Sequence, residues 1–233
     1  MKNKVAIITG ATGALGCEVV RAFLNTGATV VTTYRRSEKL RELQEHIGRT
    51  DFHAIETDVL VTAQVKAMAD EVLQQFDRID ILVNCVGGFL GGVLIADSTK
   101  EQWQQMFDLN FKSVFLCSRQ VLPVMIKQQS GRIINIGSKG GLQGASGISA
   151  YAASKAALIN FTQSLAAEGK PHNITANVVI PSIVDSPENR AAMPKANFET
   201  WVTAESLANV ILFLSSDEAR DITGASVPVF GKG

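Results

Sequence analysis

The sequence has little cysteine, no excess of charge of either sign and no long hydrophobic run, and each absence excludes a class of protein. Only 3 of its 233 residues are cysteines. Cys17, Cys85 and Cys117 are widely spaced among apolar neighbours, so we expect reduced thiols in a cytoplasmic protein, with neither a disulfide framework nor a metal site. With 22 basic against 22 acidic side chains, the chain lacks the cationic excess that nucleic-acid binding requires.

The apolar residues are spread through the chain and not gathered into one segment. No stretch reaches the roughly 18 consecutive apolar residues of a membrane-spanning helix, so we expect no membrane segment. Residues 1–4 enter an apolar run without a hydrophobic signal region, which predicts that the protein is not secreted. With 46% hydrophobic residues, the chain can bury a substantial core, which excludes intrinsic disorder.

Short runs rich in Val and Ile alternate along the chain with segments whose apolar residues recur every three to four positions. The first kind, typical of strands buried on both faces, occupies 5–9, 29–33, 51–56, 79–84, 131–137, 173–180 and 226–229. The second kind, typical of helices, occupies 16–24, 37–47, 61–76, 101–127, 150–168 and 205–215. Because alternating strands and helices form right-handed βαβ units, we predict an α/β protein with a single doubly wound parallel sheet and helices on both faces.

Residues 182–202 do not fit this alternation. They follow the sixth predicted strand and contain Pro187, Pro194 and several polar residues. A connection of this length in a compact domain is usually functional, so we predict a lid over a substrate site, with a solvent-exposed insertion as the alternative. No linker or compositional break divides the chain, and residues 1–233 are expected to form one domain.

A glycine-rich turn follows the first predicted strand and opens a helix. Glycines allow a tight bend and a close approach of the backbone to a pyrophosphate, whose charge then lies at the helix N-terminus. The position between a strand and a helix is the context that a dinucleotide-binding turn requires. The residues that the turn offers to a dinucleotide are Gly10, Thr12, Gly13, Ala14, Leu15 and Gly16.

Two arginines bear on which nicotinamide cofactor is used. An acidic residue after the second strand holds the ribose 2′-hydroxyl of NAD, whereas an arginine there accommodates the 2′-phosphate of NADP. No Asp or Glu occurs between Gly27 and Ser37, and the second strand is followed by Arg35 and Arg36. We therefore favour NADP(H) over NAD(H), with Arg35 as the first choice for the phosphate and Arg36 as the second.

A tyrosine, a lysine and a serine supply the elements of proton transfer. Tyr151 and Lys155 lie four residues apart on a predicted helix and project from one face. A tyrosine has an ordinary pKa of about 10 and exchanges protons poorly near neutral pH unless a nearby cation favours its phenolate. Ser138 follows the fifth strand, at the carboxyl end where open α/β sheets bind ligands, and its hydroxyl is placed to hold a substrate carbonyl oxygen.

Together these motifs, in this order and at these separations, resemble the short-chain dehydrogenase/reductase family over nearly the whole chain. The residues that carry the resemblance are Thr9 to Gly16, Asn84 to Gly87, Asn110, Ser138 and Tyr151 to Lys155. The resemblance implies the Rossmann fold, an NAD(P)-dependent oxidoreductase that transfers hydride between nicotinamide and a carbonyl or alcohol, and a homodimer or homotetramer.

The resemblance also implies a role for each site residue. Tyr151 is the general acid or base, Ser138 polarises the substrate oxygen, Lys155 binds the nicotinamide ribose and lowers the pKa of Tyr151, and Asn110 holds a water in the proton relay. Asp58 meets the adenine. Further cofactor contacts implied in the same way lie at Val59, Asn84, Gly87, Pro181, Ile183 and Ser186.

The chain departs from the usual family pattern in its glycines and in the segment after the sixth strand. Gly13 to Gly16, Asp185 to Pro194, Phe198 and Trp201 are similar to the dihydropteridine reductase branch, whose members reduce a quinonoid pterin, normally with NADH and without the strand-end serine. Pterin reduction is therefore one alternative. A second is a non-catalytic NADP-binding redox sensor, although such sensors commonly lack the Tyr and Lys that this chain has.

Several apolar residues near the expected site are candidate substrate walls, with core packing as the alternative interpretation. They are Phe89, Leu142, Ile183, Met193 and Trp201.

Overall fold

The computed structural model describes residues 1–232 and contains a seven-stranded parallel sheet with strand order β3-β2-β1-β4-β5-β6-β9. The strands are β1 Val5–Thr9, β2 Thr29–Tyr34, β3 His53–Glu56, β4 Ile81–Asn84, β5 Gly131–Ile136, β6 Ile174–Pro181 and β9 Ser226–Val229. The strand order reverses between β1 and β4, which is the topological switch point of a doubly wound sheet. This confirms the predicted α/β class, the single doubly wound parallel sheet and the Rossmann fold.

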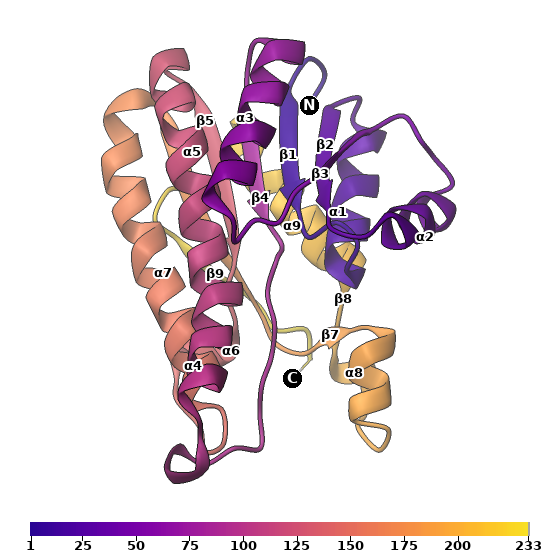
Figure 1. Ribbon diagram of the computed structural model, residues 1–233, viewed down its shortest axis with the longest axis vertical. Helices are drawn as coiled ribbons and strands as arrows, with labels where there is room; N and C mark the ends of the chain where they lie inside the picture. The colour runs from indigo at the N-terminus through magenta and orange to yellow at the C-terminus, as the bar shows by residue number, and fades with distance from the viewer. Residues whose placement is uncertain (233) are drawn as a thin grey trace.

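Helices cover both faces of the sheet (Figure 1). The helices are α1 Ala14–Asn25, α2 Ser37–Ile47, α3 Thr62–Phe76, α4 Lys100–Phe107, α5 Ser113–Gln128, α6 Lys139–Leu142, α7 Ser149–Gly169, α8 Pro187–Ala192 and α9 Ala204–Leu214. One core cluster joins α1, α2 and α9 to the sheet through Phe23, Leu43 and Leu207. A second joins α3 and α5 to the opposite face through Met68 and Met125. Because both faces are covered, the central strands are buried throughout, which explains their unbroken apolar runs.

The predicted helix over residues 101–127 is interrupted. It divides into α4 and α5, and a π-helical turn, η2 Asp108–Lys112, lies between them. The apolar periodicity continues across this turn, so the sequence pattern did not show it. A π turn inserts an extra residue into the helical ladder and is frequent at functional sites. Here it contains Asn110, which is fully buried.

The segment predicted as a lid contains little regular secondary structure, but contacts among its own residues hold it together. Its two-residue strands β7 Val184–Asp185 and β8 Val202–Thr203 pair in parallel, and α8 lies between them. Within α8, Arg190 forms two hydrogen bonds to Asp185, at 2.6 and 2.7 Å, and its guanidinium lies 4.8 Å from the ring centre of Phe198. Figure 1 shows α8 projecting below the carboxyl ends of the strands.

The helices of the described chain, residues 1–232, are each too short or too polar to cross a lipid bilayer.

Candidate active site

Two glycines of the β1–α1 turn are required by close backbone contacts. Gly10 has a φ of +69°, and a Cβ there would lie 2.7 Å from the backbone nitrogen of Val86 after β4. A Cβ on Gly16 would lie 2.2 Å from the carbonyl oxygen of Gly10. Gly13 is different, because its Cβ would have no neighbour nearer than 3.5 Å. Gly16 therefore lets α1 pack closely against the end of β1, and Gly10 lets the turn approach the chain after β4.

The turn leaves the start of α1 open to an anion. Gly13 is the N-cap residue, so no side chain caps the helix, and Ala14 to Cys17 supply no acidic group. The first amides of a helix have no partner within the helix and carry the positive end of its dipole. A pyrophosphate at this point would meet backbone N–H groups and a glycine surface that admits it closely.

Arg35 lies beside a residue from another loop. Its Nη1 is 4.0 Å from Oδ2 of Asp58, which follows β3, and both Arg35 and Arg36 are about two-thirds exposed, at 65% and 67%. A pocket of 560 Å³ extends from Arg35 and Leu60 to Lys100 on α4. The structure thus brings together Arg35 and Asp58, the residues expected to contact the two ends of an adenosine 2′-phosphate, and Arg35 also lines the pocket.

The serine and tyrosine predicted for catalysis lie side by side at Gly140, where an added Cβ would be 3.7 Å from Ser138 Oγ and 3.5 Å from the Tyr151 ring. Ser138 caps α6, where its Oγ accepts a hydrogen bond from the Gly140 amide at 3.2 Å. Burial raises the pKa of Tyr151 above its ordinary value, and the interaction with the Ser138 side chain partly opposes that rise. At neutral pH the phenol therefore keeps its proton, and its hydroxyl lies beside the hydroxyl that is placed to hold a substrate oxygen.

Lys155 is buried, and its ammonium group is held by the backbone. Its Nζ donates a hydrogen bond to the carbonyl oxygen of Ile136 at 2.7 Å. Burial lowers its pKa from 10.5 to about 8, because the charged form loses hydration. Gly87 leaves room beside it, since a Cβ there would lie 3.5 Å from Nζ and 3.1 Å from Oδ1 of Asn110. The structure thus places Gly87, Asn110 and Lys155 in one cluster.

The side chain of Asn110 forms hydrogen bonds both to the loop after β4 and to α7. Its Oδ1 accepts from the Gly88 amide at 2.9 Å, and its Nδ2 donates to the Gly88 carbonyl at 3.0 Å and to Ser154 Oγ at 3.1 Å. These bonds use both hydrogens of the side-chain amide. A water held by Asn110 would therefore donate to the second lone pair of Oδ1 or bind at the main chain, and the relay role of this residue stays a prediction.

A buried chain of polar side chains supports the carboxyl ends of β4 and β5. Nδ2 of Asn84 donates to Oδ1 of Asn135 at 2.8 Å, and Nδ2 of Asn135 donates to Oγ1 of Thr162 on α7 at 2.9 Å. The sequence argument missed Asn135, Thr162 and Ser154. A signal was present for Asn135, because an asparagine inside an otherwise apolar buried strand needs a hydrogen-bond partner.

The residues predicted after β6 divide into buried and exposed groups. Ser186 is buried and caps α8, where its Oγ accepts from the Asn189 amide at 3.2 Å. Pro181 ends β6, and Ile183 is 39% exposed. Trp201 is buried, with its ring 4.8 Å from that of Phe198. Trp201 therefore packs within the segment, whereas Ile183 remains available to a ligand.

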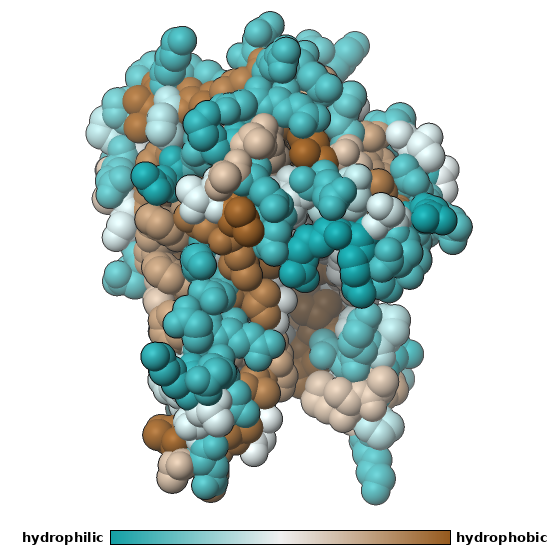
Figure 2. Space-filling model, in the orientation of Figure 1, coloured by the Kyte–Doolittle hydropathy of each residue, from teal (hydrophilic) through white to brown (hydrophobic). Residues whose placement is uncertain are grey.

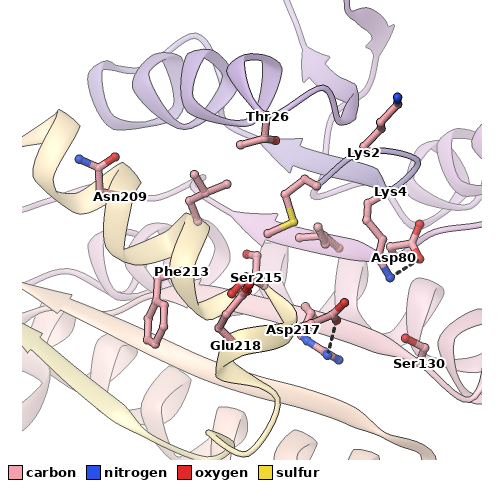
Figure 3. Close-up of a pocket in the computed structure, with 15 residues that line it drawn as sticks. Lys2, Lys4, Thr26, Asp80, Ser130, Asn209, Phe213, Ser215, Asp217 and Glu218 are labelled. Carbon is pink, nitrogen blue, oxygen red and sulfur yellow. Dashed lines mark hydrogen bonds and ion pairs between the residues drawn. The ribbon is translucent and has the colours of Figure 1, made fainter.

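A second pocket lies at the other end of the strands (Figure 3). It measures 470 Å³ and is lined by residues that precede or begin β1, β4 and β5 and by the end of α9. Four of its charged residues form two pairs: Lys4 Nζ lies 3.8 Å from Asp80, and Arg132 Nη2 lies 3.2 Å from Asp217. The residues predicted for cofactor and catalysis are absent from its described lining.

One cluster of possible metal ligands forms among the described residues, from Cys17, Glu18 and His46. Arg21 already holds the Glu18 carboxylate at 3.0 Å. The absence of a metal site stays a prediction.

Comparisons with known proteins agree on one family. Residues 4–197 match the family described as short chain dehydrogenase. The chain is 34% identical to the 3-oxoacyl-[acyl-carrier-protein] reductase FabG of Thermotoga maritima, over 99% of this chain and 98% of that protein. It is 32% identical to the Escherichia coli reductase of the same name, over 99% and 97%. A solved structure described as a short-chain dehydrogenase/reductase from Burkholderia xenovorans is 30% identical, with a TM-score of 0.90 over 99% and 96% of the two chains.

Proposed function

Because the chain belongs to the short-chain dehydrogenase/reductase family and is an NAD(P)-dependent oxidoreductase, we propose that it interconverts a carbonyl compound and an alcohol, with Tyr151 as the general acid or base. When bound, NAD(P) supplies or accepts the hydride. The observation that carries the proposal is that Ser138 Oγ and the ring of the half-buried Tyr151 meet at Gly140, with buried Lys155 one helical turn further along α7.

At neutral pH, Tyr151 and Lys155 have the protonation states that carbonyl reduction requires. A proton donor must hold its proton at the working pH, and burial raises the pKa of Tyr151. Ser138 then orients the substrate oxygen toward the phenol, and Tyr151 donates its proton to that oxygen as charge develops on it. Lys155 is the nearby cation that stabilises the resulting phenolate, as long as the pH stays below its own pKa of about 8.

The residues of the turn fit a dinucleotide, and those after β2 favour NADP. Gly10 and Gly16 hold the turn through close backbone contacts, Gly13 has open space where a pyrophosphate would approach, and the first amides of α1 have no side-chain cap. Arg35 is exposed at the rim of the pocket, where a 2′-phosphate would replace Asp58 as its partner. Arg36 is the second cation within reach.

The substrate is a small molecule, and the names of the relatives suggest one class. Two of them are 3-oxoacyl reductases, so a 3-oxoacyl thioester belongs in any substrate panel. Quinonoid dihydropterin belongs there too, because the glycine turn and residues 185–194 resemble the dihydropteridine reductase branch. We propose that residues 182–202 close over the substrate as a lid of the single domain, and that the chain forms a homodimer or homotetramer.

The test is Tyr151→Phe, which keeps the ring and removes the proton. We expect cofactor binding, measured by fluorescence titration, to change less than twofold, and turnover on the best substrate to fall by about a hundredfold or more. The panel combines simple ketones, a 3-oxoacyl thioester and quinonoid dihydropterin, each with NADPH and NADH. Cofactor binding without turnover of any substrate would instead support the redox sensor, and unchanged turnover of Tyr151→Phe would exclude Tyr151 as the acid.

A further inference from the structure

Exposed apolar side chains gather around one end of the sheet. Among residues 1–232, five of the eight large hydrophobic side chains that are exposed lie in the three loops that follow β4, β5 and β6. These five are Phe89, Leu94, Ile95, Leu142 and Ile183. In the space-filling view, a hollow with hydrophobic residues on its walls separates the α4 side of the molecule from the α8 side (Figure 2). An apolar surface exposed at a ligand-binding edge indicates a binding site for apolar groups.

Phe89 stands directly beside the proton donor. Its ring centre lies 4.9 Å from that of Tyr151, with the two planes at 80°, an edge-to-face arrangement. Yet 67% of Phe89 is exposed. One side of the ring therefore contacts Tyr151 while most of its surface faces solvent. Covering this apolar surface with a ligand would lower the free energy of the complex.

The surrounding backbone holds the Phe89 ring in place. A Cβ on Gly91 would lie 2.6 Å from Cζ of Phe89, so glycine is what allows the loop to fold back over the ring. A hydrogen bond joins this loop to the segment before α7: the Val93 amide donates to the Gly147 carbonyl at 3.2 Å. The ring is thus packed against its own loop as well as against Tyr151.

A gap of about one methyl group adjoins the reactive hydroxyls. A Cβ on Gly140 would meet Ile148 at 3.3 Å, the Tyr151 ring at 3.5 Å and Ser138 Oγ at 3.7 Å. The missing side chain of Gly140 therefore leaves a space no larger than a methyl group, which is bounded by Ile148 and by both residues that would hold the carbonyl oxygen. A substituent on the carbonyl carbon would pack over this space, against the bare backbone of Gly140.

The loops around this space carry few charges. Residues 85–99 contain only Asp97 as a charged residue, and residues 137–148 contain only Lys139. The Lys139 ammonium lies 5.2 Å over the ring of Phe230. The lid has two basic residues, Arg190, which is engaged by Asp185, and the exposed Lys195. In the two loops, a carboxylate or phosphate close to the reacting carbonyl would thus find no cation other than Lys139.

We propose that Phe89, Ile148 and the space at Gly140 form an apolar subsite, and that the substrate is a ketone, or the corresponding secondary alcohol, with an uncharged hydrophobic substituent next to the reacting carbon. This inference rests on the proposed function and specifies the substrate class of the same site. Phe89 then acts as a specificity residue, since the substituent covers the ring surface that solvent now meets.

The first test compares Phe89→Ala with Phe213→Ala, a matched control in which an exposed phenylalanine is removed from α9. The substrates are an aryl methyl ketone, acetone and a free 3-oxo acid, all with NADPH. We expect the wild type to prefer the aryl ketone. Phe89→Ala should lower kcat/KM for that ketone by about tenfold or more, mainly through KM, and change acetone less than twofold. Phe213→Ala should change neither.

The pH profile separates a binding role of Phe89 from a role in shielding Tyr151. If Phe89 only shields Tyr151 from water, its removal would alter the pH profile and lower kcat/KM equally for the aryl ketone and acetone, and this result would overturn the subsite. A wild-type preference for the charged 3-oxo acid would overturn it as well.

The second test fills the space with a methyl group. Gly140→Ala should lower kcat/KM for the aryl ketone by about tenfold and spare acetone, whereas Gly144→Ala, where a Cβ meets no neighbour within 4 Å, should have no effect. Binding of an aryl secondary alcohol to the NADP-loaded enzyme, measured by calorimetry, gives a readout without turnover. Binding that Phe89→Ala weakens supports the subsite even if the proposed catalysis fails, and binding unaffected by either variant contradicts it.

Discussion

The nucleotide side of the cleft and the substrate side are built by different means. On the nucleotide side, Gly10 and Gly16 set the turn through backbone contacts that admit no side chain. On the substrate side, Phe89 and Ile183 are exposed on loops, and the lid is joined by the surface ion pair between Asp185 and Arg190. Backbone geometry tolerates little change, whereas exposed side chains on loops are replaced at small cost to stability. Cofactor binding is therefore the constrained half of this protein, and substrate choice is the adjustable half.

The largest expected effect is on the nucleotide side, at Gly16→Ala. The added Cβ would meet backbone atoms of Gly10 and Ala11, which cannot move without shifting α1 from the sheet. We expect the free energy of unfolding, measured by urea denaturation, to fall by about 3 kcal/mol or more.

Gly13→Ala is the matched control in the same turn. Its Cβ has open space, and the loss expected from replacing glycine by alanine at an N-cap is only about 0.5 kcal/mol. Equal losses in the two variants would show that glycine flexibility matters in this turn, and not the close packing of α1.

The next largest effect on the free energy of unfolding is expected from Lys155→Met, which removes the buried cation between the two sides. Burial lowers the pKa of Lys155 from 10.5 to about 8, so the charged lysine destabilises the fold. The corresponding free energy is about 3 kcal/mol, reduced by the lost hydrogen bond to Ile136. We expect Lys155→Met to raise the free energy of unfolding at pH 7 by about 1–3 kcal/mol while turnover is lost.

The sign of this effect follows from proton binding. Between pH 8 and 10.5 the unfolded chain binds more protons at this lysine than the folded chain does, so wild-type stability rises with pH across that window. The advantage of Lys155→Met should therefore be full below pH 8 and disappear near pH 10.5. An advantage that is independent of pH, or one shared by the exposed control Lys127→Met, would assign the effect to something other than a buried charge.

Sequence reasoning predicted the fold and the position of the glycine turn between a strand and a helix, whereas the cofactor contacts of that turn stay a prediction. A glycine turn between a strand and a helix is a local pattern, and Gly10, Gly13 and Gly16 lie within seven residues. The fold was predicted because buried strands and amphipathic helices have distinct periodicities. The edge-to-face contact of Phe89 with Tyr151 joins residues that are far apart in the chain, and the π turn at Asn110 leaves no mark on the apolar pattern. Such features depend on tertiary packing and were not predicted.

An effect of intermediate size is expected at the adenosine end, with Arg35→Ser. Arg35 is exposed beside Asp58, so its hydrogen bonds to a 2′-phosphate would be partly screened by solvent. We expect the dissociation constant for NADPH, measured by fluorescence titration, to rise about tenfold, or about 1.4 kcal/mol, with NADH changed less than twofold. Arg36→Ser should have the smaller effect. A similar loss for NADH would place Arg35 elsewhere on the cofactor.

The smallest effect is expected in the lid, with Arg190→Ala. The ion pair with Asp185 and the contact with Phe198 are both at the surface, where such pairs contribute about 0.2–1 kcal/mol. We expect less than about 1 kcal/mol of change in the free energy of unfolding. Amide exchange in residues 186–200 should nevertheless become faster, because these contacts join α8 to the segment that follows it.

Lys195→Ala, an exposed cation in the same segment, is the control and should leave exchange unchanged. If Arg190→Ala also sped exchange in β1 and β5, the lid would share the stability of the sheet, and the division into a constrained half and an adjustable half would be wrong. Faster exchange confined to the lid, together with a raised KM for the ketone and an unchanged dissociation constant for NADPH, would show that the substrate side opens without disturbing the nucleotide side.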